Sequence, residues 1–172
     1  TMTKIYQNCH ICLASSSPRR KELLKKFGFK FDSCSPNINE TPKLNEIAKN
    51  FVKRMSHEKA TSVIKKYRTD KDIIVLAGDT VVFSHGNILG KPKTNRHAKE
   101  MLLQLSGNTH NVFSGFTIID SKSGYEISKV ISTKVKFIKL KEKQIEWYIN
   151  TGEPFGKAGS YSIQGVGSIF VE

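Results

Sequence analysis

The chain has 172 residues, of which 38% are hydrophobic and 25% are charged. This length is enough for one substantial core, and the composition is typical of a globular protein, so disordered and fibrous classes are excluded. Uncharged apolar runs reach only about ten residues, whereas a helix that crosses a bilayer needs ~20. We therefore expect one domain over residues 1–172, without a transmembrane helix, a signal peptide or a membrane partner.

Positive charge is the strongest bias in the composition, because 28 Lys and Arg residues against 15 Asp and Glu residues give a formal net charge of +13. Such a charge predicts an anionic partner, and it leaves nucleic acid, a phosphorylated small molecule and a plain solvated surface open. The basic residues are spread along the chain and are not interleaved with aromatic residues as in a stacking platform for nucleic acid. A solvated basic surface is therefore the preferred interpretation, and nucleic acid is the weaker expectation.

The three cysteines, an odd number, disfavour a disulfide framework and predict a reducing compartment, the cytoplasm. Cys9 and Cys12 form a C-x-x-C pair, but no second pair completes a zinc site. They lie in a strand-like segment, where residues three apart point to opposite faces. Buried thiols are therefore the preferred interpretation, over a metal or redox role.

The chain is predicted to begin with a strand in KIYQNCHICLAS and to continue into a helix. Ser17 is a suitable N-cap, Pro18 fits the first helical position, and Gly28 ends the helix. The start of this helix is a candidate anion site, because its backbone N–H groups lack partners within the helix and its dipole favours negative charge.

Hydroxyl and guanidinium groups gather at that helix start. Ser15 and Ser17 supply hydroxyl donors, and Arg19 and Arg20 supply planar forks that suit phosphate oxygens. Positive charge in a first helical turn is unfavourable because it opposes the helix dipole. Residues that are locally unfavourable in this way tend to occur at functional sites. An ordinary turn with two exposed arginines is the alternative, and the functional interpretation is preferred.

A second pair of cap and proline, Thr41-Pro42, predicts a long helical region to about Tyr67, with a break near Ser56 left open. The segment DIIVLAGDTVVF then predicts a strand that Gly78-Asp79 interrupts. A carboxylate in a segment bound for the core needs a partner, and a metal ion or a lysine such as Lys91 would supply one. A turn or β-bulge at Asp79 is an equally weighted alternative.

The second half is predicted to alternate between strands and helices. SHGN turns the chain into ILGKP, and Thr94 caps a helix that ends at Gly107. The remaining predicted elements are strands over roughly 109–119 and 125–140, a helix over 142–149, and a glycine-rich loop with a closing strand. This order predicts an α/β fold with a mixed sheet and flanking helices.

Two further segments bear on nucleotide binding. GNILGKPK is similar to a phosphate-binding loop, but it is one residue short and has Pro92 where a hydroxyl residue would hold Mg²⁺, so a Walker-type site is rejected. In the glycine-rich end, Lys157 offers a charge and Gln164 offers an amide that can read a base edge, although a plain surface loop is the better interpretation of that segment when it stands alone.

Taken together, the motifs resemble the Maf family of nucleotide pyrophosphatases over almost the whole chain. The segments that carry the resemblance are Ala14-Ser15-x-Ser17-Pro18-Arg19-Arg20, Gly78-Asp79-Thr80, Gly90-Lys91-Pro92, Leu105-Ser106-Gly107 with His110, and Thr151-Gly152-Glu153-Pro154 with Lys157-Ala158-Gly159-x-Tyr161-x-Ile163-Gln164-Gly165. The resemblance implies a two-lobed fold related to inosine triphosphatase-like enzymes, with the active site in a central cleft. It also implies hydrolysis of a nucleoside triphosphate to the monophosphate and pyrophosphate with Mg²⁺ or Mn²⁺.

The resemblance also implies roles for individual residues. Asp79 matches the catalytic acid, which would orient or deprotonate the attacking water, and Glu40 matches an acid that joins it at the metal. The positions that match substrate-binding residues are Ser15, Ser17, Arg19, Arg20, Lys59, Thr80, Lys91, Lys157 and Gln164.

Three of these positions, Arg19, Thr80 and Gln164, are similar to the branch that acts on dTTP and UTP. A homodimer is implied as well. Two departures from the family pattern stand out, because Gly156 and Asn39 replace residues that are usually acidic. Relatives also continue beyond the position at which this chain ends, so a naturally short and a truncated terminus are both open. A nucleotide-binding regulator without turnover and a basic nucleic-acid-binding protein remain the alternative functions.

Overall fold

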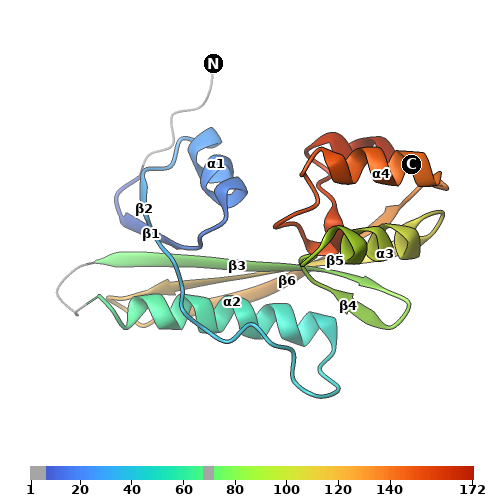
Figure 1. Cartoon of the computed structure of the whole chain (residues 1–172). Helices are drawn as coiled ribbons and strands as arrows, with labels where there is room; N and C mark the ends of the chain where they lie inside the picture. The colour runs from blue at the N-terminus through green and yellow to red at the C-terminus, as the bar shows by residue number, and fades with distance from the viewer. Residues whose placement is uncertain (1–6, 68–71) are drawn as a thin grey trace. The chain divides into compact units, whose positions relative to one another are not determined.

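The computed structural model describes residues 7–67 and 72–172, and its elements form one six-stranded sheet with helices packed on it (Figure 1). In chain order the elements are β1 (His10–Ala14), α1 (Pro18–Lys26), β2 (Phe31–Cys34), α2 (Ala48–Ile64), β3 (Ile73–Ser84), β4 (Asn87–Leu89), α3 (Asn95–Leu105), β5 (Thr109–Asp120), β6 (Glu126–Lys136), α4 (Glu142–Asn150) and the 3₁₀ helices η1 (Ala158–Ser160) and η2 (Val166–Phe170). The part of the first predicted strand before Gln7 lies outside the described residues.

The sheet is mixed, as the sequence predicts. Its strand order is β2-β1-β3-β5-β6, with β4 paired to β3. Strand β1 runs parallel to β2 and to β3, whereas β4 runs antiparallel to β3. Helix α1 connects β1 to β2, and α2 lies between β2 and β3, so each connection between these parallel strands contains a helix, which is the usual way to join parallel strands. The predicted α/β class is confirmed.

The chain divides into two compact units, which correspond to the two predicted lobes. Unit 1 contains the described residues up to Asp79 together with Gly115–Val130, and unit 2 contains Thr80–Ser114 together with Ile131–Glu172. The boundary therefore passes through β3 between two adjacent residues that the sequence marks as candidates for the site.

Unit 1 packs α2 along the sheet (Figure 1). Its core consists of Cys12, Ala14, Ala60, Val63, Ile73, Val75, Ala77 and Ile119. The approach between helix and sheet is very close at one point, because a Cβ at Gly115 of β5 would lie 2.5 Å from the carbonyl oxygen of Val52 in α2. Only glycine fits this position without moving the helix, so Gly115 sets the distance between α2 and the strand.

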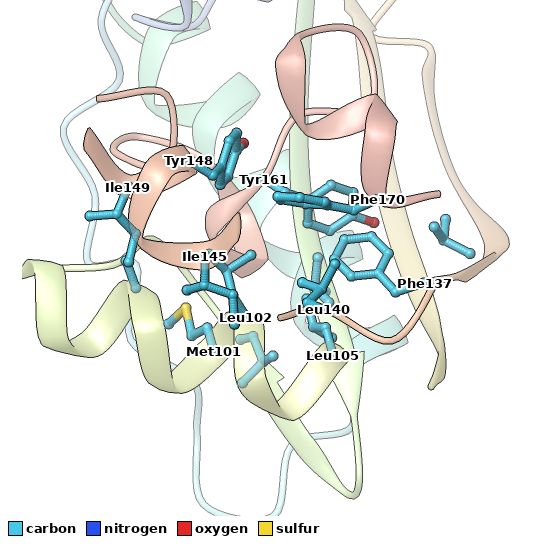
Figure 2. Close-up of a cluster of buried hydrophobic side chains, with 14 residues drawn as sticks. Met101, Leu102, Leu105, Phe137, Leu140, Ile145, Tyr148, Ile149, Tyr161 and Phe170 are labelled. Carbon is cyan, nitrogen blue, oxygen red and sulfur yellow. The ribbon is translucent and has the colours of Figure 1, made fainter. Parts of the chain in front are cut away.

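Unit 2 has a larger core, which Figure 2 shows between α3, α4 and the carboxyl-terminal segment. Its largest members include Met101, Leu102, Leu105, Phe137, Leu140, Ile145, Tyr148, Ile149, Tyr161 and Phe170. Thr94 caps α3 as predicted, since its Oγ1 accepts a hydrogen bond from the His97 N–H over 3.1 Å. Aromatic rings in this core meet edge to face, as in the pair Phe137 and Tyr161 with centroids 4.7 Å apart.

The prediction that the second helix begins at Thr41-Pro42 is wrong, because residues 41–47 form a loop that side chains hold in place. Arg54 of α2 donates to both carboxylate oxygens of Glu46, over 2.7 and 2.6 Å, and to the Thr41 carbonyl over 3.1 Å. The Lys43 N–H also donates to Glu46. These contacts engage backbone groups that a helix would need, so α2 begins only at Ala48.

Helix α2 has no break near Ser56. Its hydroxyl donates to the Lys53 carbonyl over 2.9 Å and shares a 2.9 Å hydrogen bond with Thr117 Oγ1. Thr117 also contacts Ser128 Oγ at 2.7 Å. Because this buried network satisfies the hydroxyl, α2 continues through it without interruption.

Three further predictions need correction. Strand β3 is continuous from Ile73 to Ser84, so neither a turn nor a bulge interrupts it at Asp79. Of the C-x-x-C pair, Cys12 is buried as predicted, but Cys9 is exposed. The closing strand is reduced to a single bridge between Phe137 and Val171, because η1 and η2 take up the preceding residues. Within residues 7–67 and 72–172, the helices are too short or too polar to span a bilayer.

Candidate active site

The centre of the candidate site is a lysine between two carboxylates in unit 1. The Nζ atom of Lys59, from α2, donates to Asp79 Oδ1 over 2.7 Å and to Glu40 Oε2 over 2.9 Å. Lys59 and Asp79 are 6% and 8% exposed, so this ion pair is buried, whereas the side chain of Glu40 is half exposed. The structure thus gives the carboxylate in the core strand a lysine partner, Lys59, where the sequence suggested Lys91.

The local folding of unit 1 explains why these groups meet. Residues along β3 alternate between the two faces, and Asp79 follows Ala77 and Val75 on a buried face. Lys59 lies on the buried face of α2, near Met55 and Ser56, and therefore points toward the strand. The loop before α2 then brings Glu40 to the same ammonium group.

Arg20 of α1 adds a second cation beside Asp79. Its Nη1 donates to Ser15 Oγ over 3.4 Å, and Ser15 Oγ also accepts a hydrogen bond from the Ser17 N–H over 3.1 Å. The guanidinium lies against the strand at Gly78, where an added Cβ would come within 3.4 Å of its Nε. Arg20 is thus within van der Waals distance of the residue that precedes Asp79, a contact that the sequence alone did not indicate.

These contacts change the acidity of the central groups. Burial raises the pKa of Asp79 above its ordinary value, and the neighbouring Lys59 and Arg20 act against that shift. Burial also lowers the pKa of Arg20, while Asp79 opposes this change. A guanidinium stays charged at neutral pH regardless. A carboxylate with a raised pKa accepts a proton more readily, which is what a general base requires.

At the start of α1, the structure has the predicted helix boundary. Ser17 is the N-cap residue but its side chain makes no capping hydrogen bond, and the first turn contains no acidic residue. Arg19 and Arg20 are both half-buried in that turn. The combination of helix dipole, serine hydroxyls and two guanidinium groups suits a phosphate group.

The remaining predicted residues lie in unit 2. Thr80 follows Asp79 in β3, and its Oγ1 is 3.4 Å from Ser114 Oγ. The segments of Lys91 and Lys157 are joined by a hydrogen bond of 3.0 Å from the Gly159 N–H to the Gly90 carbonyl. Gln164 is exposed in the loop between η1 and η2. The structure thus forms two groups of candidates.

The two groups of candidate residues correspond to the two compact units of the chain. Unit 1 holds Ser15, Ser17, Arg19, Arg20, Glu40, Lys59 and Asp79, and unit 2 holds Thr80, Lys91, Lys157 and Gln164.

The donor set suits a divalent cation that is shared with a substrate. Glu40 and Asp79 converge on one cation, the Lys59 ammonium, and Mg²⁺ is typically held by one or two carboxylates together with phosphate oxygens and water. In the described part of the chain, no three His, Cys, Asp or Glu side chains gather as a closed metal cage. Glu40 and Asp79 are therefore the side chains that could hold a divalent cation together with the phosphates of a substrate.

The two departures from the family pattern have simple local explanations. Asn39 accepts a hydrogen bond from the Thr41 N–H over 3.0 Å, so its side chain stabilises its own loop. Gly156 has a φ of +75°, a backbone conformation that favours glycine, and a Cβ there would meet open space.

The fold and the site define a class of α/β protein. In this class, a buried aspartate on a central strand is paired to a lysine and flanked by an arginine. Comparison with known proteins narrows this class. The profile of the family described as Maf-like protein matches residues 10–172. The chain belongs to this family.

Two curated relatives agree with the assignment. A dTTP/UTP pyrophosphatase of Clostridium tetani is 46% identical over 161 residues, which cover 93% of this chain and 83% of that protein. A dTTP/UTP pyrophosphatase of Acinetobacter baylyi is 41% identical over 159 residues, which cover 92% and 84%. Among solved structures, a nucleoside-triphosphatase / dITP/XTP pyrophosphatase from Mycobacterium abscessus is matched with a TM-score of 0.44 and 15% identity, over 74% of each chain.

Proposed function

We propose that this protein is a nucleoside triphosphate pyrophosphatase that hydrolyses dTTP and UTP to the monophosphate and pyrophosphate. The proposal is supported by the family, by the activity in the names of relatives such as that of Clostridium tetani, and by the chemistry of unit 1. The observation that carries it is the buried Asp79 with its raised pKa, held by Lys59 beside Arg20. This arrangement provides a base next to fixed positive charge, which hydrolysis of a phosphoanhydride requires.

In the proposed reaction, Asp79 accepts a proton from a water molecule as the water oxygen attacks the α-phosphorus. The bond from the α-phosphorus to the oxygen that bridges to the β-phosphorus breaks, and its electron pair leaves with pyrophosphate. Lys59 holds the carboxylate of Asp79 in place through the 2.7 Å hydrogen bond. A positioned base of this kind typically contributes about 10²–10⁴-fold to the rate.

Positive groups are assigned to the charge that develops on the departing pyrophosphate. In unit 1 these are Arg19, Arg20 and the start of α1 with the Ser15 and Ser17 hydroxyls, and in unit 2 they are Lys91 and Lys157. A divalent cation held by Glu40 and Asp79 would neutralise phosphate charge and polarise the phosphoryl group when bound.

Base recognition is assigned to Gln164, with Thr80 and Arg19 as further residues that set preference. The amide of glutamine presents one donor and one acceptor side by side, which matches the N3–H and O4 edge of thymine and uracil. Cytosine offers the opposite pattern at the same edge, with a donor at N4. Because a glutamine amide can turn over to match either pattern, the proposal requires that the substrate-bound site hold the Gln164 amide in one orientation, in which cytosine leaves polar groups without partners.

A nucleotide panel tests the proposal. Purified protein with Mg²⁺ or Mn²⁺ should release pyrophosphate faster from dTTP and UTP than from dCTP, dATP and dGTP, and Asp79→Asn should lower the rate at least about 100-fold. The matched control is Asp72→Asn, because Asp72 pairs with Lys122 on the surface. Background rates in wild type would refute the proposal, and tight nucleotide binding without turnover would instead indicate a regulator.

Two expectations about partners stay predictions. The predicted homodimer is checked by size-exclusion chromatography with light scattering, which measures the molar mass of the protein as it elutes. Nucleic-acid binding, which the charge of +13 leaves open, would have to weaken steeply with salt to count as an electrostatic activity of this surface.

A further inference from the structure

Glu153, in the Thr151-Gly152-Glu153-Pro154 turn after α4, makes an unusual set of contacts within unit 2. Its Oε2 accepts a hydrogen bond from the Val166 N–H over 2.8 Å, and its Oε1 accepts hydrogen bonds from the Gly167 N–H over 2.9 Å and from the Tyr148 hydroxyl over 2.8 Å. One carboxylate thus connects the end of α4 to the first two residues of η2. Those N–H groups have no partner within a helix, so a carboxylate suits them well.

The backbone next to Gln164 is fitted closely around this carboxylate. A Cβ at Gly165 would lie 2.4 Å from Glu153 Oε2, and a Cβ at Gly167 would lie 2.8 Å from the Tyr148 hydroxyl. Both glycines therefore allow the chain to pass directly over the Glu153 and Tyr148 side chains. The position of Gln164, one residue before Gly165, depends on that close approach.

The ionisation of Glu153 agrees with its hydrogen-bond contacts. Burial alone would raise the pKa of Glu153, but the hydrogen bonds from Gly167, Tyr148 and Val166 outweigh it and the pKa is lowered. The carboxylate is therefore ionised at neutral pH, and all of its contacts are with donors of the same unit. Its role is structural support for the segment and not proton transfer.

A second anchor holds the other side of the same segment. The Tyr161 hydroxyl lies 2.8 Å from His110 Nε2 in the buried core, and Ser160 Oγ donates to Met101 Sδ over 3.1 Å. Between the two anchors, Ile163 and Gln164 are exposed. The described residues show no hydrogen bond to the Gln164 side chain, so both functional groups of its amide are available to a base edge.

We infer that Glu153 is a positioning residue that sets base selectivity by fixing the backbone that carries Gln164. This inference rests on the proposed function, in which Gln164 reads the thymine or uracil edge. A small displacement of the amide would weaken two hydrogen bonds to the base, whereas Asp79 is not among the contacts of Glu153. Selectivity between dTTP and dCTP is therefore the property that Glu153 controls.

A double-mutant cycle tests the inference. Glu153→Gln keeps the size of the side chain but places an NH₂ group against backbone donors. It should lower the ratio of kcat/KM for dTTP over dCTP about fivefold, through KM, with kcat for dTTP within about threefold of wild type. In the Gln164→Ala background the same change should lower the ratio less than twofold. Equal losses in both backgrounds, or no loss in either, would overturn the inference.

Two controls separate positioning from general damage. Glu146→Gln alters an exposed carboxylate of α4, which contacts Lys99 at 3.4 Å, and should leave the ratio unchanged. Gly165→Ala pushes the backbone away from Glu153 from the opposite side, so it should reproduce the loss of selectivity even where Glu153→Gln folds poorly. A Gly165→Ala protein with normal selectivity would also overturn the inference.

Hydrogen exchange and binding distinguish failure of this inference from failure of the proposed function. Amide exchange at Val166 and Gly167 should accelerate at least about tenfold in Glu153→Gln, and unchanged exchange would refute the positioning role whatever the activity. If wild type releases no pyrophosphate, the proposed function fails, and the cycle is then measured from dissociation constants for dTTP and dCTP.

Discussion

Lys59 Nζ lies 2.7 Å from Asp79 Oδ1, and both side chains are buried in unit 1. The same ammonium group lies 2.9 Å from Glu40, so one lysine pairs with both carboxylates that are assigned to a divalent cation. A buried ion pair of this kind is weak evidence for added stability, but loss of one partner leaves an uncompensated charge. The lysine therefore has a role in folding as well as in the proposed chemistry.

Substitution of Lys59 by methionine should affect both properties. Lys59→Met leaves Asp79 buried beside Arg20 without its hydrogen-bond donor, so the free energy of unfolding should fall by about 3–5 kcal/mol and kcat/KM for dTTP at least about 100-fold. Urea unfolding and pyrophosphate release measure the two effects. Lys122→Met, which removes a cation paired with exposed Asp72, should change neither. Wild-type stability in Lys59→Met would contradict the burial argument.

Stability should fall in mild acid because of His110. Burial lowers the pKa of His110 to about 4, from an ordinary value near 6.5. The unfolded chain therefore takes up a proton near pH 6.5 while the folded ring stays neutral. Above that pH, His110 does not change the free energy of unfolding. As the pH falls from about 6.5 to 4, the free energy of unfolding decreases by about 2–3 kcal/mol.

The measurement is urea unfolding at several pH values between 7.5 and 4. His110→Gln should flatten the pH dependence of the unfolding free energy, whereas substitution of the exposed His85 by glutamine should retain the wild-type slope. An unchanged slope in His110→Gln would show that other groups cause the loss.

Arg20 and Arg19 should differ in what they control. The Arg20 guanidinium fits against Gly78 between Ser15 and Asp79, so Arg20→Lys should lower kcat/KM for dTTP and UTP alike, by about 10–100-fold, because a lysine cannot reproduce the planar fork. Arg19→Trp should instead change the preference among nucleotides. Kinetics on dTTP, UTP, dCTP and GTP distinguish the two effects, with exposed Lys25→Ala as a control, and a common pattern for both arginines would contradict the assignment.

Glu40 should control the requirement for metal. Its side chain converges with Asp79 on one cation position, so Glu40→Gln should raise the Mg²⁺ or Mn²⁺ concentration for half-maximal activity about tenfold. Mn²⁺ binding to the protein, followed by electron paramagnetic resonance, should weaken in parallel. Asn39→Ala should shift both values less than twofold, since the Asn39 side chain bonds to its own loop. The opposite ranking of the two variants would place the metal elsewhere.

The sequence predicted much of the fold because local signals were strong. Caps and glycines marked both ends of α1 and α3, and the apolar run of β3 marked the central strand. The start of α2 was missed because a long-range hydrogen bond decides it: Arg54 engages Glu46 and the Thr41 carbonyl. Caps and prolines indicate where a helix is able to begin, and tertiary contacts select among those positions.

The site was harder to predict, because its partners come from distant segments. The pattern around Asp79 required a cation, but nothing local identified it as Lys59. A usable signal was present in α2, where Lys59 falls on the same helical face as Val52, Met55 and Ser56. A lysine on an apolar face predicts a buried partner of opposite charge. The role of Glu153 was beyond such reasoning, because it depends on where η2 begins.

Hydrolysis of dTTP in water enriched with ¹⁸O, with wild type and Asp79→Asn in parallel, tests the central claim most directly. Water that attacks the α-phosphorus delivers one ¹⁸O atom to dTMP and none to pyrophosphate, which mass spectrometry of the two products resolves. We predict labelled dTMP and unlabelled pyrophosphate from wild type, and at least about 100-fold less of both from Asp79→Asn. Label in pyrophosphate or in released phosphate, or an Asp79→Asn protein as active as wild type, would contradict the proposed function and the role of Asp79.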